Sequence, residues 1–212
     1  MSVANDGRNP RSRHHGYSED HWDAAPKRSR KERPPRRTVT ECLEAGEITH
    51  TDAVEKTREA VLRTLDRTAK SRSDLERSLA LKGYPQEVAE AVLDRLTEVG
   101  LIDDAALASS IVRTRHTERG LSRRAIAQEL RRKGIPEEIA TQALEQVDDA
   151  GEQDACAVLA ARLLARTRGQ DHSARVRKAV SALARRGYGA GLAYGAVNDA
   201  LEREASSEAV NE

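Results

Sequence analysis

A basic helical stretch that ends at a glycine occurs three times in this chain of 212 residues. The copies are Leu79–Tyr84 (LALKGY), Leu130–Ile135 (LRRKGI) and Leu183–Tyr188 (LARRGY), and their glycines are 51 and 53 residues apart. We expect each glycine to end its helix in the left-handed conformation that a glycine adopts without strain. A period of this length predicts a tandem array of supersecondary units, in which each unit packs mainly on its neighbours.

The pattern between the glycines is helical. From about Thr51 onward, Leu and Ala recur at spacings of three and four residues, as they do on the apolar face of a helix. The chain is 38% hydrophobic and 33% charged, which is little material for one large core but enough for small ones. Glycine and proline interrupt the pattern too often for a coiled coil. We therefore predict an all-α fold of three tandem three-helix, helix-turn-helix-like repeats.

The composition divides the chain into five segments. We expect a disordered basic arm at 1–50, repeats at 51–102, 103–150 and 151–205, and a disordered tail at 206–212. The first 40 residues contain ten Lys and Arg, five acidic residues and four of the six prolines, with few aliphatic residues to form a core. Such an arm favours a polyanion such as DNA or RNA. The equally weighted alternative is a solubilising extension without a specific role.

The sequence also indicates a compartment. The N-terminus lacks the apolar region of a signal peptide, and no uncharged stretch is long enough to span a bilayer. Cys42 and Cys156, the only cysteines, lack the neighbours of a zinc site, so we expect reduced thiols. These features predict a soluble cytoplasmic protein.

Two of the repeats are predicted to carry a cationic ridge on their second helix. Around the helix that is expected to begin at Ser122 and end before Gly134, Arg124, Arg131 and Arg132 fall opposite the apolar Ile126 and Leu130. The helix before Gly187 has the same division, whereas its counterpart before Gly83 mixes both charge signs. The alternative is a solvated helix face, but such faces usually mix signs, and arginine suits bidentate phosphate or carboxylate contacts. The candidate residues are Arg113, Arg115, Arg123, Arg124, Arg131, Arg132, Lys133, Arg175, Lys178, Arg185 and Arg186.

No catalytic constellation is recognisable in the sequence. Asp103 and Asp104 could belong to the metal site of a nuclease, but no further carboxylates are suitably placed, and a helix N-cap explains them better. Neither cysteine has a partner that indicates a nucleophile. We therefore predict a protein that is not an enzyme and has no cofactor or metal. A helix-turn-helix DNA-binding regulator is the alternative function.

Residues 100–135 resemble the signature of the RecX family, bacterial regulators of the RecA recombinase. The resemblance rests on Gly100–Asp104 (GLIDD), Ile111–Arg115 (IVRTR) and Gly120–Ile135, and it extends more loosely over residues 53–203. It implies three three-helix repeats in an elongated, curved array, without catalytic activity. It further implies a protein, which we expect to be monomeric, that binds the RecA filament on single-stranded DNA. There it would restrain ATP hydrolysis, strand exchange and co-protease activity, in DNA repair, recombination and the SOS response.

Two features depart from the family pattern. Family members commonly carry aromatic residues where this chain has Leu107 and Ile111, so the core of the second repeat is expected to be built differently. The basic arm lies outside the common core of the family, so the resemblance assigns it no role.

Overall fold

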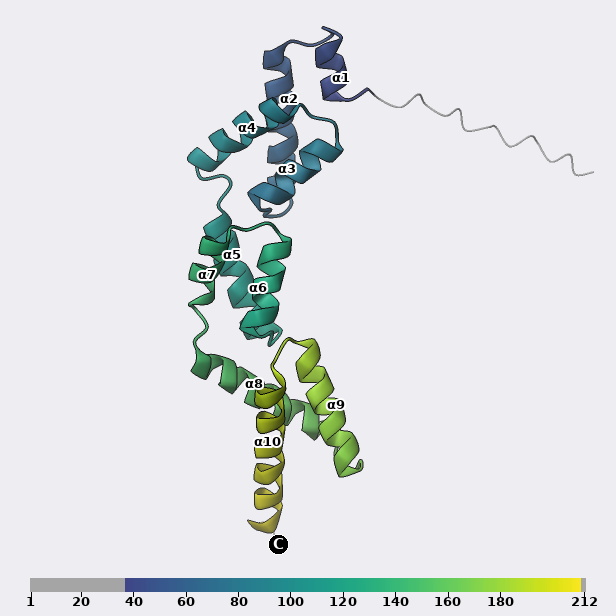
Figure 1. Ribbon diagram of the computed structural model, residues 1–212, viewed down its shortest axis with the longest axis vertical. Coiled ribbons are helices and arrows are strands. Elements are labelled where there is room, and N and C mark those ends of the chain that lie inside the picture. The colour runs from purple at the N-terminus through teal and green to yellow at the C-terminus, as the bar shows by residue number, and fades with distance from the viewer. Residues whose placement is uncertain (1–36, 211–212) are drawn as a thin grey trace, which may run out of the picture. The chain divides into compact units, whose positions relative to one another are not determined.

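The computed structural model describes residues 37–210, and Figure 1 shows them as a succession of helices. Short α1 (Val39–Glu44) precedes the first repeat, which consists of α2 (His50–Leu65), α3 (Arg72–Leu81) and α4 (Gln86–Glu98). The second repeat contains α5 (Asp104–Arg113), the π-helical turn η1 (Thr114–Glu118), α6 (Arg123–Arg132) and α7 (Glu137–Leu144). The third contains α8 (Asp149–Ala165), α9 (His172–Arg185) and α10 (Ala190–Val210).

The predicted all-α class and its three-helix repeats are confirmed, since residues 37–210 contain no strand. Each repeat has its own apolar core. Leu75, Leu79 and Leu93 are buried in the first, and Ile126 and Leu130 in the second. The third is formed by Leu164, Leu183 and Val197 with the aromatic ring of Tyr188. Three small cores therefore replace one large core, as the lean apolar composition requires.

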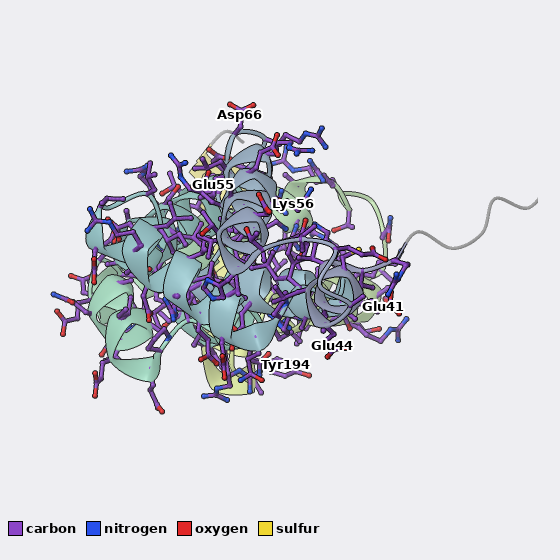
Figure 2. The ribbon with its side chains drawn as sticks, turned by 90° about the horizontal axis from the view of Figure 1, so that it is seen from above. Glu41, Glu44, Glu55, Lys56, Asp66 and Tyr194 are labelled. Atoms are coloured by element: carbon purple, nitrogen blue, oxygen red, sulfur yellow. The ribbon has the colours of Figure 1, made fainter. Side chains whose placement is uncertain are left out.

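The two ends of the array differ from the expected segments. Helix α1 lies inside the stretch 1–50 that we expected to be disordered, because Thr38 and Glu41 form a capping box and Val39 and Leu43 pack on the first core. Figure 2 labels Glu41 and Glu44 on this helix. At the other end α10 continues to Val210, past the expected limit of 205. The remainder of the expected arm, residues 1–36, and residues 211–212 lie outside the described part of the chain.

Each of the three marker glycines has a second role beyond ending its helix. Gly83, Gly134 and Gly187 have φ of 71°, 68° and 91°, which confirms the predicted left-handed caps. A Cβ on Gly134 would also lie 2.5 Å from the Cβ of Ser73, and one on Gly187 would lie 2.7 Å from that of Ala125. These neighbours belong to the first turn of the second helix in the preceding repeat. The glycine therefore marks the point where one second helix meets the next.

Hydrogen bonds join these helices end to end. The hydroxyl of Ser71, which caps α3, donates to the carbonyl of Lys133 at the end of α6 over 2.5 Å. The backbone N–H of Ser122, which caps α6, donates to the carbonyl of Arg186 at the end of α9 over 3.0 Å. At α1, the N–H and hydroxyl of Thr40 both donate to the carbonyl of Gly83. The free carbonyls of one helix terminus are thus satisfied by donors at the next helix start.

An acidic side chain from the following repeat completes each of the two junctions. Asp104 at the start of α5 accepts from the backbone N–H of Arg72, and Glu152 of α8 accepts from that of Arg123, each over 3.0 Å. Both N–H groups belong to the first turn of a second helix, where a carboxylate is favourable. Burial at the junction raises the pKa of Asp104. Because Asp103 caps α5 through the N–H of Ala106, the capping interpretation of this acidic pair is confirmed, although Asp104 caps a different helix.

The junction glycine can be tested against a glycine of the same conformation in open space. Gly46 has φ of 67° with no atom within 4 Å of an added Cβ, so Gly46→Ala measures only the left-handed strain of about 1 kcal/mol. We expect Gly134→Ala to lower the free energy of unfolding by about 1–3 kcal/mol more than this control, because its Cβ meets Ser73. Urea denaturation measures both values.

A double-mutant cycle identifies the contact responsible. Ser73→Gly removes the side chain that an added methyl would meet, so Gly134→Ala should cost no more than the control when it is made in that background. An equal cost in both backgrounds would show that the junction does not require the glycine.

Candidate functional site

The exposed side of α6 is the centre of the predicted cationic surface. Arg124, Arg131 and Arg132 are exposed there, while Ile126 and Leu130 on the opposite side are fully buried. The serine cap at Ser122 fixes where the helix begins, and hence which residues face outward. The structure therefore places these three arginines on the surface, as the helical pattern predicts.

The guanidinium of Arg115, in contrast, is occupied by a carboxylate of this chain and is not free to contact a partner. Its guanidinium makes a bidentate ion pair with Glu129 of α6, with Nη2 to Oε1 at 2.7 Å and Nε to Oε2 at 2.8 Å. The hydrogen bonds from Arg115 lower the pKa of Glu129, and both side chains are largely buried. Arg115 therefore fastens η1 to α6. Glu129, the one acid in the basic stretch, is neutralised by this pair and does not offset the charge of the exposed arginines.

Arg175 was expected to face outward on α9, and this prediction is wrong. Its guanidinium pairs with Glu204 of α10 at 2.5 Å, and the two side chains are only 14% and 13% exposed. Hydrogen bonds from Arg175, and then from Arg168, lower the pKa of Glu204. The partner lies 29 residues further along the chain, so the helical pattern of α9 alone could not reveal it.

Three further basic residues lie at the junctions between repeats. Lys133 is 4.0 Å from Asp74 of α3, and Arg123 forms an ion pair with Asp149 at the start of α8. Arg186 is half-buried and donates to the carbonyl of Ala182 in its own helix. Lys133 and Arg186 lie at the C-terminal ends of α6 and α9, where cations interact favourably with the last carbonyls, whereas Arg123 begins α6 and acts through its carboxylate partner.

The remaining candidates are exposed and have no carboxylate within ion-pair distance among residues 37–207. Arg124 donates to the carbonyl of Gly187, and Lys178 to the side chain of Gln170, but both charges remain uncompensated. The free cationic set is therefore smaller than the sequence predicted, and it consists of Arg113, Arg124, Arg131, Arg132, Lys178 and Arg185.

No group of three or more His, Cys, Asp or Glu in the described chain could hold a metal ion. Cys42 and Cys156 are free thiols, and burial raises the pKa of Cys156 to about 11. No helix of residues 37–210 has the length and apolarity needed to cross a membrane.

Comparison with known proteins shows which proteins share this arrangement. The model of the first three-helix domain of RecX matches residues 58–96, and that of the second matches residues 103–144. The regulatory protein RecX of Thermobifida fusca is 43% identical over 159 residues, covering 75% of this chain and 86% of that protein. The chain belongs to the RecX family. RecX of Streptomyces coelicolor is 44% identical over 153 residues, covering 72% and 81% of the two chains.

Solved structures of RecX share the fold. One crystal structure of RecX matches with a TM-score of 0.61 at 30% identity, over 70% of this chain and 73% of that one. RecX from Lactobacillus salivarius matches with a TM-score of 0.63 at 23% identity, over 71% and 97%. Within the RecX fold, this chain has Ile111 buried and Leu107 half-buried in the second core. These two residues therefore fill the positions where we expected family members to carry aromatics.

Alanine substitutions of two neighbouring arginines on α9 compare the stability contribution of a buried ion pair with that of an exposed charge. We expect Arg175→Ala to lower the free energy of unfolding by about 2 kcal/mol at neutral pH, because it leaves Glu204 without its main partner. Arg177→Ala removes an exposed guanidinium two residues away and should change it by less than about 0.5 kcal/mol. Urea denaturation of both variants gives the comparison.

The stability contribution of the Arg175–Glu204 pair is expected to fall as the pH is lowered. Because the pKa of Glu204 is lowered in the folded protein, the pair with Arg175 stabilises above the ordinary pKa of a glutamate. This contribution is lost as the pH falls through the lowered value. The difference between wild type and Arg175→Ala should therefore shrink in acid, and a difference independent of pH would contradict the ion-pair role.

Proposed function

We propose that this protein is a non-enzymatic regulator that binds the RecA nucleoprotein filament and mainly restrains its ATP hydrolysis, strand exchange and co-protease activity. It would act in DNA repair, recombination and the SOS response, and hence in the cytoplasm, and it would bind as a monomer. Membership of the RecX family supports this proposal, together with the name of regulatory protein that the relatives carry.

The observation that carries the proposal is the free cationic set on α5, α6 and α9. Six basic side chains are exposed without a carboxylate partner, and they lie on two consecutive repeats. A nucleoprotein filament offers both acidic protein side chains and DNA phosphates in a repeating arrangement. Binding at two repeats makes the second contact intramolecular, so weak individual contacts combine into a stable complex.

Charge reversal on the free cationic set tests the proposal. We expect Arg131→Glu, Arg132→Glu and Arg185→Glu combined to keep the helical content while weakening binding to RecA filaments on single-stranded DNA by at least about tenfold. The loss should be larger at low salt than at high salt, because ions screen exposed charges. Inhibition of RecA ATP hydrolysis, measured against protein concentration, reports the affinity, and circular dichroism reports the fold.

A control of equal charge change comes from the first repeat. Lys56, labelled on α2 in Figure 2, is exposed, as are Arg67 and Lys82. The variant with all three changed to Glu should inhibit RecA as wild type does. If wild-type protein at stoichiometric excess leaves ATP hydrolysis unchanged, the proposed function is wrong. If both triple variants inhibit equally, the cationic set is only a solvated face.

A helix-turn-helix regulator of duplex DNA is the second candidate, because α6, the turn at Gly134 and α7 have the arrangement of that motif. The second helix of such a motif presents its first turn to the bases. In α7 this turn contains Glu137 and Glu138, which would repel the phosphates. Sequence-dependent binding to duplex DNA in the absence of RecA would favour this candidate.

The basic arm can be separated from the array by deletion. The structure places the cut after residue 36, because removing α1 would expose the first core where Val39 and Leu43 cover it. Residues 1–36 contain nine Lys and Arg and five acidic residues, so their deletion should weaken binding of free single-stranded DNA, measured by fluorescence anisotropy. Inhibition of RecA should remain. Loss of inhibition with a retained fold would assign the arm to the filament-binding surface.

A further inference from the structure

A groove between the second and third repeats lies mostly outside the predicted ridge and shares only Arg186 with its candidate residues. Its volume is about 630 Å³, and it lies between the segment 116–121 and α8. Arg186, at the end of α9, also lines it. The groove is large enough to receive several side chains of a partner.

Helix α8 presents apolar residues to this groove at the edge of its own core. Cys156, Ala160 and Leu164 form the buried face of α8 in the third core. Leu159 packs on the edge of this core and is half-buried, whereas Val158 is outside the core and 59% exposed. An exposed apolar residue beside a half-buried one gives the groove an apolar floor, which becomes favourable to bind once it is covered.

The rim of the groove is cationic. Arg162 and Arg166 follow Val158 at intervals of four residues, so they lie on the same face of α8, and Arg119 stands on the opposite wall. None of these three guanidiniums has a carboxylate within ion-pair distance in the described chain. Glu118 and Asp154 are the acidic residues of the lining, so the groove has an excess of positive charge.

The wall formed by residues 114–121 is held in place before any partner binds. The ion pair of Arg115 with Glu129 fastens η1 to α6. Gly120, in the left-handed conformation at φ of 58°, donates its N–H to the carbonyl of His116 and would place a Cβ 3.5 Å from Leu159. A preformed wall lowers the entropic cost of binding.

We infer that this groove binds an acidic segment of a partner protein that inserts an apolar side chain over Val158. Charge complementarity with Arg119, Arg162 and Arg166 selects the acidic segment. The apolar floor favours a protein over a nucleic acid, whose phosphates gain nothing from Val158. Among the residues that the structure describes, no Trp or Tyr lines the groove and His116 is its one aromatic ring, so it offers little surface on which single-stranded bases could stack. The inference rests on the proposed function in taking a RecA protomer as the carrier of this segment.

Two variants separate the apolar from the electrostatic contribution to filament binding. Val158→Gln introduces a good helix former while making the floor polar, and we expect it to weaken binding to RecA filaments about threefold. Arg162→Glu with Arg166→Glu should weaken it about tenfold. Val99→Gln, at another exposed apolar residue, and Lys56→Glu with Arg67→Glu are the matched controls, and they should bind as wild type does.

Co-sedimentation of the full-length chain with RecA filaments measures these affinities, and anisotropy with a labelled single-stranded oligonucleotide measures binding to DNA alone. The inference requires that both groove variants lose filament binding while their oligonucleotide binding is unchanged. If the arginine variant loses oligonucleotide binding and Val158→Gln has no effect on either, the groove binds phosphates and the inference is wrong. Wild-type filament binding by both groove variants would also overturn it and leave the proposed function intact. If the wild-type protein does not bind filaments, the proposed function itself is wrong.

Discussion

The contact between a glycine and the first turn of the preceding second helix is the interaction on which the array depends. At Gly134 and Gly187 the two backbones approach so closely that a single methyl group would collide with Ser73 or Ala125. The approach allows the last carbonyls of α6 and α9 to accept from the caps of α3 and α6. Backbone polar groups that a solitary helix leaves to water are thereby satisfied inside the protein, and each repeat holds its neighbour in register.

This arrangement also divides the basic residues between two roles. Those at the helix ends, such as Lys133 and Arg186, lie where positive charge stabilises carbonyls, and they are partly covered by the adjoining repeat. Those one or two residues earlier, such as Arg131 and Arg185, are exposed and uncompensated. A basic stretch before the glycine is therefore partly structural. Only its exposed members can contribute to binding a polyanion.

The local pattern predicts the helices, the repeat and the left-handed glycines, because each depends on residues close in sequence. It also places Arg131 and Arg132 on the surface, since three or four residues determine a helix face. It fails for Arg175 and Arg115, whose partners Glu204 and Glu129 lie 29 and 14 residues away. Such pairs depend on how helices pack within a repeat. The sequence pattern does not predict the groove beside Val158 either, because the walls of the groove come from two repeats.

The direct contact between the ends of α9 and α6 would affect how a partner is bound at two points. Because the last turn of α9 meets the first turn of α6, the distance between the exposed arginines of the two helices is determined by packed backbone and not by a flexible linker. A flexible connection would sample many distances and lose conformational entropy on binding. A filament presents equivalent groups at regular intervals, so only a fixed distance can match two of them without that cost. The glycines thus preserve the spacing that the proposed binding at two cationic sites requires.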